Sequence, residues 1–319
     1  MPSADRTEHF CTLFDSHFLP SGLALHESLA GHAQSFHLWI LCMDDRTEEA
    51  LRTLAPENVS LIPLREMETA ALSEVKKERS LREYCWTLTP FIFTAVFDRD
   101  PDIRRVTYLD ADLYFFDDPR ILLKEMDAEE KTVLITHHAP DPRYDSAPIH
   151  GKYCVQFVTF GRDAASVSIL DRWQRDCLAW CFARYDVPGR FGDQMYLDGW
   201  PEDYPDAVHV VTRTDRTLAP WNVHYFSGKI GAGLRPVFYH FHGLRIVSHE
   251  SILLYIRYHV GRFGDSLYDR YTEALQKQIS RLRSFDIPLL PLSMSREKLG
   301  WLRQLKRRIC GEIRFARIA

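Results

Sequence analysis

Strand-like and helix-like segments alternate along the first part of this chain. Apolar β-rich runs and amphipathic runs follow one another in the order Phe10–Phe14, Ser21–Ala30, Phe36–Cys42, Thr47–Leu54 and Val59–Pro63. This order is typical of parallel strands that are joined by helices covering the sheet. The chain is therefore predicted to be an α/β protein whose first half is of a nucleotide-binding type.

The same two patterns continue through most of the chain. Further strands are predicted at Arg105–Leu109, Val133–Thr136, Tyr153–Phe160, Val208–Val211 and Val237–Phe241. Further helices are predicted at Glu68–Tyr84, Thr89–Phe97, Ala164–Tyr185, Ile252–His259 and Asp265–Arg283. Pro288, Pro291 and Ser293 then indicate a hinge. We expect one domain over residues 1–285 and a basic tail over residues 286–319.

The composition excludes several classes of protein. With 45% hydrophobic and 26% charged residues, the chain is neither disordered nor of low complexity. No run approaches the ~20 consecutive apolar residues that span a bilayer, and the first residues are too polar for a secretory signal. The seven cysteines are scattered and lie mostly in apolar runs, as reduced thiols do in the cytosol. These features predict a cytoplasmic protein.

The net charge of −4 hides an asymmetry, because residues 296–319 alone carry eight basic and two acidic side chains. An acidic main body argues against nucleic acid as a partner. The apolar residues of this tail recur at helical spacing: Leu299, Leu302, Leu305, Ile309 and Ile313, with Trp301 beside them. The pattern predicts an amphipathic helix that either contacts the anionic inner face of a membrane or packs on its own domain.

Two aspartates, Asp110 and Asp112, directly follow the predicted strand Arg105–Leu109 and precede another apolar run. Buried carboxylates require a cation or a strong donor network. Mg²⁺ and Mn²⁺ take oxygen ligands and bridge phosphates, and open α/β sheets bind ligands beyond the carboxyl ends of their strands. The pair predicts a cation that binds a nucleoside diphosphate. The alternative is a turn in which Asp110 or Asp112 caps the next segment.

The segment Val106–Asp112 resembles the Asp-x-Asp strand of nucleotide-sugar glycosyltransferases with the GT-A fold, most of all those of family eight and related bacterial transferases. Phe10–Asp15 and Gly22–Leu29 are similar to the first strand and helix of that family, and the order and spacing of the matches agree over about residues 9–245. The resemblance implies a Rossmann-like GT-A fold with a C-terminal helical extension.

The resemblance also implies roles for the matching positions. The expected donor-binding residues are Thr12, Leu13, Phe14, Asp15, Arg79, Asp110, Ala111, Asp112, His242, Gly243 and Arg245. The expected metal ligands are Asp110, Asp112 and His240, the catalytic residues Asp193 and Gln194, and the acceptor-binding residues Trp221 and Asn222. Because alternate side chains of a strand share one face, His242 could exchange roles with His240.

The sequence departs from the family pattern at two places. The diphosphate-binding lysine of the family is absent after Gly243, and Arg245 is expected to substitute for it. The family's Asn-x-Gly strand corresponds here to Tyr153–Phe157, which has neither residue. Gln156 in this strand is expected to reshape the sugar pocket, because the backbone of glycine allowed a closer approach. The identity of the donor sugar is therefore left undetermined, and the chain is placed in a branch that neighbours family eight.

By this resemblance, the chain moves a sugar from a nucleoside-diphosphate donor, expected to be a UDP-sugar, to a saccharide or glycoconjugate acceptor in bacterial surface-polysaccharide assembly. Mn²⁺ or Mg²⁺ would stabilise the leaving group. Retention at the anomeric carbon is expected, with Asp193 or Gln194 close to the sugar. Asp193 as the general base of an inverting displacement is the alternative.

Two other functions are compatible with parts of the pattern. A non-catalytic GT-A scaffold would bind sugars without a metal set. A haloacid-dehalogenase-like phosphohydrolase also places Asp-x-Asp after an apolar strand, but it requires Thr or Val where Tyr114 stands. The metal-dependent glycosyltransferase accounts for more of the motifs than either alternative.

Overall fold

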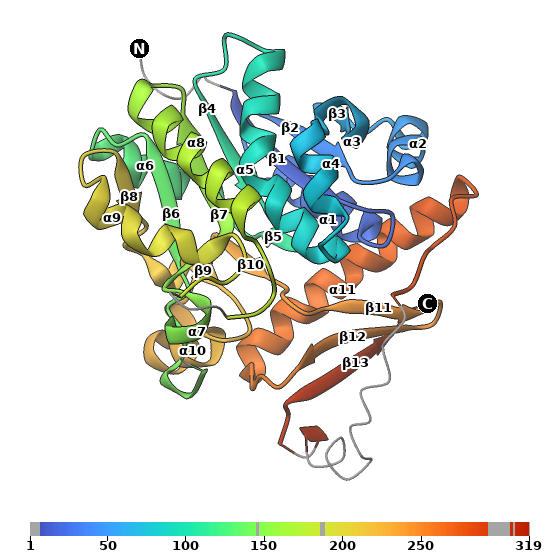
Figure 1. Ribbon diagram of the computed structural model, residues 1–319. Helices are drawn as coiled ribbons and strands as arrows, with labels where there is room; N and C mark the ends of the chain where they lie inside the picture. The colour runs from blue at the N-terminus through green and yellow to red at the C-terminus, as the bar shows by residue number, and fades with distance from the viewer. Residues whose placement is uncertain (1–6, 145–146, 186–188, 293–306, 309, 319) are drawn as a thin grey trace.

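A mixed seven-stranded sheet forms the centre of the molecule in the computed structural model, which describes residues 7–144, 147–185, 189–292, 307–308 and 310–318 (Figure 1). The strands lie in the order β3-β2-β1-β4-β7-β6-β8. Their bounds are β1 Glu8–Phe14, β2 Phe36–Cys42, β3 Val59–Pro63, β4 Arg105–Leu109, β6 Val133–His137, β7 Tyr153–Gly161 and β8 Val208–Val210. Strand β7 runs antiparallel to β4 and β6, so the expectation of parallel strands holds only for the remaining pairs.

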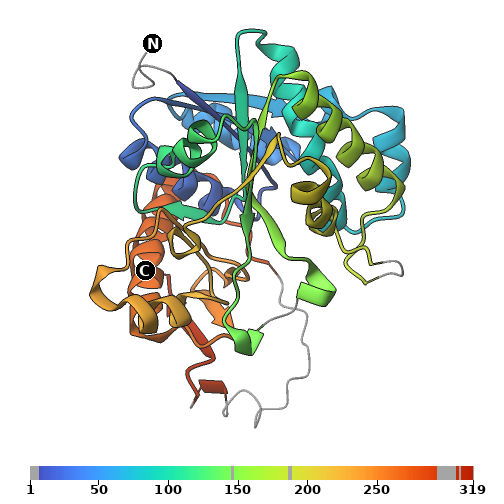
Figure 2. The ribbon, with the colours of Figure 1, turned by 90° about the vertical axis from the view of Figure 1, so that its left-hand side faces the viewer.

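Helices cover both faces of this sheet (Figure 2). One face is covered by α4 Ala70–Lys76, α5 Leu81–Arg99 and α8 Ala164–Ala179, and the other by α1 Leu19–His32, α2 Asp45–Leu54 and α6 Arg120–Ala128. Each layer has its own apolar core, and the predicted α/β class is confirmed.

The remaining described elements are short except for one long helix, α11 Gly261–Ser284. The other helices are α3 Leu64–Met67, α7 Ala147–His150, α9 Trp200–Asp203 and α10 Val223–Ile230, with 3-10 turns η2 Pro142–Tyr144, η3 Gln194–Gly199, η4 Thr214–Arg216 and η5 Gly231–Gly233. Strands β5 Leu113–Phe115, β10 Phe238–His240 and β9 Thr217–Leu218 form one small sheet, and β11 Arg245–Ser248, β12 Ser251–Ile256 and β13 Ile313–Arg317 form another. Helix α11 packs on this second sheet around a third core.

The helices between β3 and β4 differ from the two that were predicted there. The helix expected over Glu68–Tyr84 is interrupted, because Ser80 caps a new helix by accepting a hydrogen bond from the Glu83 N–H while the Glu83 carboxylate binds the Ser80 N–H. From this cap, α5 continues without a break through Pro90 to Arg99, so the segment Thr89–Phe97 is part of the same helix.

One further predicted helix is wrong at the C-terminal end, and a second falls mostly outside the described residues. Ile252–His259 was expected to be a helix, but Ser251–Ile256 forms β12 because β11 and β13 pair with it on both sides. The amphipathic helix expected in the tail lies mostly on residues 293–306 and 309, outside the described residues, and Ile313 belongs to strand β13 instead. Arg314 of this strand pairs with Asp265 and Asp269 of α11.

None of the helices in the described part of the chain is both long and apolar enough to cross a membrane.

Candidate active site

Asp110 and Asp112 lie in the turn between β4 and β5, at the carboxyl end of β4. The turn is fixed by backbone hydrogen bonds, since the Asp110 N–H donates to the Gln156 carbonyl at 3.1 Å and the Phe241 N–H donates to the Asp112 carbonyl at 2.9 Å. Strand β10 runs antiparallel to β5 and places His240 opposite Leu113. The sheet register therefore brings His240 to the two aspartates.

His240 lies between the two carboxylates. Its Nε2 atom is 3.1 Å from Asp112 Oδ1 and 3.6 Å from Asp110 Oδ2. One ligand atom from each residue lies within 4.8 Å of the others, and no other group of His, Cys, Asp or Glu in the described ranges is arranged in this way. Tyr108 donates its hydroxyl to Asp110 Oδ1 at 3.0 Å and steadies that carboxylate.

The other ring nitrogen of His240 contacts Gln156. His240 Nδ1 lies 2.6 Å from Gln156 Oε1, and both side chains are buried. A histidine that ligates a metal usually donates its second ring N–H to an oxygen acceptor in this way. Two carboxylates and one imidazole are also a donor set that suits Mn²⁺, and less closely Mg²⁺. The residues present therefore fit a divalent cation.

The three residues shift each other's pKa values strongly. Burial, with the charge of Asp112, raises the pKa of Asp110 to about 7. Burial also opposes ionisation of Asp112, but the neighbouring His240 lowers the pKa of Asp112 to about 2. Burial alone would lower the pKa of His240, yet Asp112 raises it well above its ordinary value. The site is thus built to place a positive charge between two carboxylates.

Asp193 and Gln194 lie at the start of the 3-10 turn η3. Gly192, at φ +54°, packs against the Trp86 ring so closely that a Cβ there would lie 3.2 Å from it. Asp193 is buried, and burial together with the charge of Asp110 raises its pKa well above the ordinary value. Gln194 donates to the His150 carbonyl at 2.5 Å. The structure thus brings Asp193 close enough to Asp110 for their charges to interact.

Four of the expected donor-binding residues lie at the end of β1 and directly after it. Thr12, Leu13, Phe14 and Asp15 are all buried there. Burial raises the pKa of the Asp15 carboxyl, and that of the Cys85 thiol on α5 is raised to about 12 by burial and then by the charge of Asp15. The charge of Asp193 contributes to the same shift, so the Cys85 thiol lies near both Asp15 and Asp193.

Arg79 does not contact the acidic pair in the described structure. Its guanidinium donates to the Thr87 hydroxyl and, at 2.8 Å, to the Leu178 carbonyl at the end of α8. Arg245, in contrast, lies close enough to Asp112 for each charge to shift the other's pKa. Arg82 is exposed and its charge acts on Arg245. Of these three arginines, Arg245 is therefore the one whose charge acts on Asp112, in addition to the larger effect of His240.

Trp221 and His242 lie beside the three-residue cluster. The Trp221 ring meets both His240 and His242 edge to face, with ring centroids 5.6 Å apart in each case. Burial and the charge of His240 lower the pKa of His242 to about 3. Asn222 is buried, and its amide binds the backbone of Ala219 and His138. Of the two histidines, His240 is therefore the one that lies with the aspartates. Asn222 fixes the backbone next to Trp221.

Three residues lie near the cluster although the sequence did not predict it. Gln156 was expected to face the donor sugar, and Cys154 and His138 were given no role. His138 and His240 lower the pKa of the Cys154 thiol to about 6 although burial opposes this. Alternation along β7 predicts that Cys154 and Gln156 lie on the same face of the strand. That His240 lies next to this face becomes known only from the pairing of β5 with β10.

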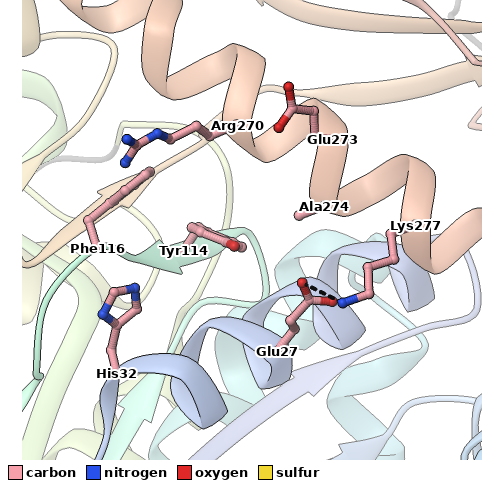
Figure 3. Close-up of a pocket in the computed structure, with 8 residues that line it drawn as sticks. All are labelled: Glu27, His32, Tyr114, Phe116, Arg270, Glu273, Ala274 and Lys277. Carbon is pink, nitrogen blue, oxygen red and sulfur yellow. Dashed lines mark ion pairs between the residues drawn. The ribbon is translucent and has the colours of Figure 1, made fainter.

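A separate hollow of about 340 Å³ is lined by Tyr114 and Phe116 together with residues of α1 and α11 (Figure 3). Two of the lining residues, Glu27 of α1 and Lys277 of α11, form an ion pair at 3.1 Å. None of Asp110, Asp112 and His240 lines this hollow. This hollow is therefore distinct from the candidate metal site.

The structure is similar to solved glycosyltransferases. The galactosyltransferase LgtC, solved in complex with donor and acceptor sugar analogs, matches 87% of this chain and 99% of its own length with a TM-score of 0.55 and 11% identity. The bifunctional glycosyltransferase WbbM matches 86% of this chain and 50% of its own, with a TM-score of 0.52 and 14% identity. At such identities the likeness shows the fold, and the predicted GT-A fold is confirmed.

Sequence comparison finds closer relatives. No family model matches the chain. The uncharacterized protein YfnF of Bacillus subtilis (strain 168) is 33% identical over 259 residues, which are 77% of this chain and 84% of YfnF. The uncharacterized protein YfnD of the same strain is 30% identical over 288 residues, which are 87% of this chain and 92% of YfnD. This chain, with its GT-A fold, belongs to the family of YfnF and YfnD.

Proposed function

We propose that this protein is a metal-dependent glycosyltransferase that moves a sugar from a nucleoside-diphosphate donor to a saccharide or glycoconjugate acceptor. The observation that carries the proposal is the grouping of Asp110, Asp112 and His240 at the carboxyl end of β4 in a GT-A fold. This is the edge at which open α/β sheets bind their ligands.

Asp110, Asp112 and His240 would hold Mn²⁺ or Mg²⁺. A cation bound there supplies positive charge that stabilises a departing nucleoside diphosphate. Arg245 adds a second positive charge close to Asp112. By the resemblance to family eight, Thr12–Asp15 take the base and ribose, and Ala111, His242 and Gly243 line the donor site. Uridine diphosphate is the nucleotide that we propose.

Retention at the anomeric carbon is the outcome that we propose. Burial raises the pKa of Asp193 well above its ordinary value. The proposal rests on the resemblance to family eight, in which the matching Asp-Gln pair faces the transferred sugar. On this proposal Asp193 and Gln194 face the sugar without activating the acceptor hydroxyl.

The acceptor side is assigned to Trp221. Its ring lies next to His240 and His242, so it flanks the metal site, and Asn222 fixes the turn that carries it. Aromatic rings offer flat apolar faces on which sugars pack. We place the reaction in bacterial surface-polysaccharide assembly in the cytoplasm. Contact of residues 296–319 with the inner membrane face is a further part of the proposal.

A panel of nucleotide sugars incubated with the protein and MnCl₂ tests this function. We expect Mn²⁺-dependent release of the nucleoside diphosphate from one donor, and no release with EDTA. Asp112→Asn should slow the release by about 100- to 1000-fold. Thr159→Val is the matched control, because Thr159 is also buried in the central sheet and its hydroxyl bonds that of Thr107, which does not belong to the cluster. Release that is equal in EDTA, or absent for every donor, would contradict a metal-dependent transferase.

A further inference from the structure

Gln156 lies in the middle of β7 and contacts two of the three cluster residues. Its carbonyl accepts the Asp110 N–H at 3.1 Å, and its side-chain Oε1 lies 2.6 Å from His240 Nδ1. The residue is 1% exposed, and His240 is 4% exposed. Water is therefore poorly placed to replace Gln156 as the partner of the His240 ring.

The neighbouring hydrogen bonds fix the orientation of the Gln156 amide. Thr136 donates its hydroxyl to the Cys154 carbonyl at 3.2 Å, so its oxygen offers only lone pairs to other groups. Gln156 Nε2 lies 3.5 Å from that oxygen and donates to it. Its Oε1 must then point to His240, where an amide oxygen can only accept a hydrogen bond.

We propose that Gln156 is a positioning residue of the metal site. By accepting from His240 Nδ1–H, it keeps the proton off Nε2 in the neutral ring, and Nε2 is the atom that faces Asp110 and Asp112. The imidazole lone pair is thereby aimed at the cation. This inference rests on the proposed function, because it requires that the cluster binds a metal.

This role differs from the one that the sequence suggested. Gln156 was expected to reshape the sugar pocket, since it stands where the resembled family has a donor-sugar strand. Its side-chain oxygen is instead directed to His240 and its nitrogen to Thr136. A substitution here should therefore change the affinity for the metal first, and the choice of sugar donor only as a consequence.

Three substitutions separate this role from simple packing. Gln156→Met keeps the length and volume of the side chain but removes the acceptor. Gln156→Asn keeps the amide but shortens the side chain by one methylene, so the oxygen no longer reaches His240. Gln156→Glu keeps the length and the acceptor, and a carboxylate accepts a histidine N–H at least as well as an amide. Thr159→Val on the same strand is the matched control.

The experiment is a titration of each metal-stripped protein with MnCl₂ alone, in which electron paramagnetic resonance counts the free ion. We expect Gln156→Met and Gln156→Asn to weaken Mn²⁺ binding by about 10- to 100-fold, and Gln156→Glu and Thr159→Val to bind like the wild type. Thermal denaturation shows that each protein is folded, and if Gln156→Met does not fold, Gln156→Asn carries the test.

The failure of this inference can be distinguished from failure of the metal site itself. Asp112→Asn is titrated in parallel. If that variant loses Mn²⁺ while both acceptor-deficient Gln156 variants bind it like the wild type, the role of Gln156 is overturned and the site stands. Weak binding by Gln156→Glu would also overturn it, because the acceptor would then not be the feature that matters. If the wild type and Asp112→Asn bind Mn²⁺ equally, the proposed function fails and the inference with it.

Discussion

Asp112 Oδ1 lies 3.1 Å from His240 Nε2, although the two residues are far apart in the sequence. They meet because Asp112 directly precedes β5 and His240 ends β10, and these two strands are paired antiparallel. A carboxylate and an imidazole held by two paired strands form a rigid site. Rigid ligands at the end of a central strand are what binding of a cation and a diphosphate requires.

Asp112→Asn should remove most of the transferase activity while the protein stays folded. The substitution keeps the shape of the side chain but removes the charge that faces His240. We expect kcat/KM for the nucleotide-sugar donor to fall by about 100- to 1000-fold. Steady-state release of the nucleoside diphosphate measures this, with circular dichroism as the test of folding. A variant that turns over at the wild-type rate would remove Asp112 from the site.

Arg245→Gln and Arg79→Gln should affect different properties. Arg245 lies near Asp112, so its loss should raise KM for the donor by about tenfold, or about 1.4 kcal/mol. Arg79 binds Thr87 and the Leu178 carbonyl, so its loss should lower the free energy of unfolding by about 1–3 kcal/mol.

Donor kinetics and urea unfolding of both variants check this pair of expectations. The assignment would be reversed if Arg79→Gln kept its stability and lost donor affinity.

Glu48 should make the stability of the protein depend on pH in the acidic range. Hydrogen bonds from Arg65 and Arg52 lower the pKa of Glu48 from 4.5 to about 2. Because the folded-state pKa is depressed, the stabilisation is complete above pH 4.5 and is lost as the pH falls toward 2. Thermal unfolding of Glu48→Gln should differ most from the wild type near neutral pH. A difference that grows on acidification would contradict this linkage.

Removal of the C-terminal residues should destabilise the main body. Strand β13 completes the sheet with β11 and β12, and Arg314 binds Asp265 and Asp269 on α11. Deletion of residues 307–319 should therefore lower the unfolding temperature, and Arg314→Gln should lower it less because the strand remains. Differential scanning calorimetry measures both. An unchanged unfolding temperature for the deletion would show that β13 contributes nothing to stability.

Local sequence patterns predicted many of the central strands well. Strands β2, β3 and β4 begin and end where the apolar runs do, because a strand covered by helices reads as a continuous apolar segment. Strand β12 was mistaken for a helix, because Ser251–Ile256 carries no alternation that separates the two patterns. Its pairing with β13 depends on a segment near the end of the chain, which no local window includes.

At the candidate site, too, the sequence predicted the local pattern but not the contacts between distant segments. The residue types and spacing around Asp110 and Asp112 pointed to a cation, and the family resemblance pointed to His240. The structure brings these three together. Neither the partner of the His240 ring nor the actual contacts of Arg79 could be predicted, because both depend on how β7 and α8 pack against distant segments. Side-chain contacts between remote elements are set by tertiary packing and leave no periodic pattern.

Calorimetric titration with uridine diphosphate tests whether the Asp110–Asp112–His240 cluster binds a nucleotide through a metal, and it requires neither the sugar nor the acceptor. We expect the wild type to bind the nucleotide in the presence of MnCl₂ and not in EDTA, and Asp112→Asn to bind it in neither buffer. Equal binding with and without the metal, or by the variant, would show that the cluster is not a metal-dependent nucleotide site.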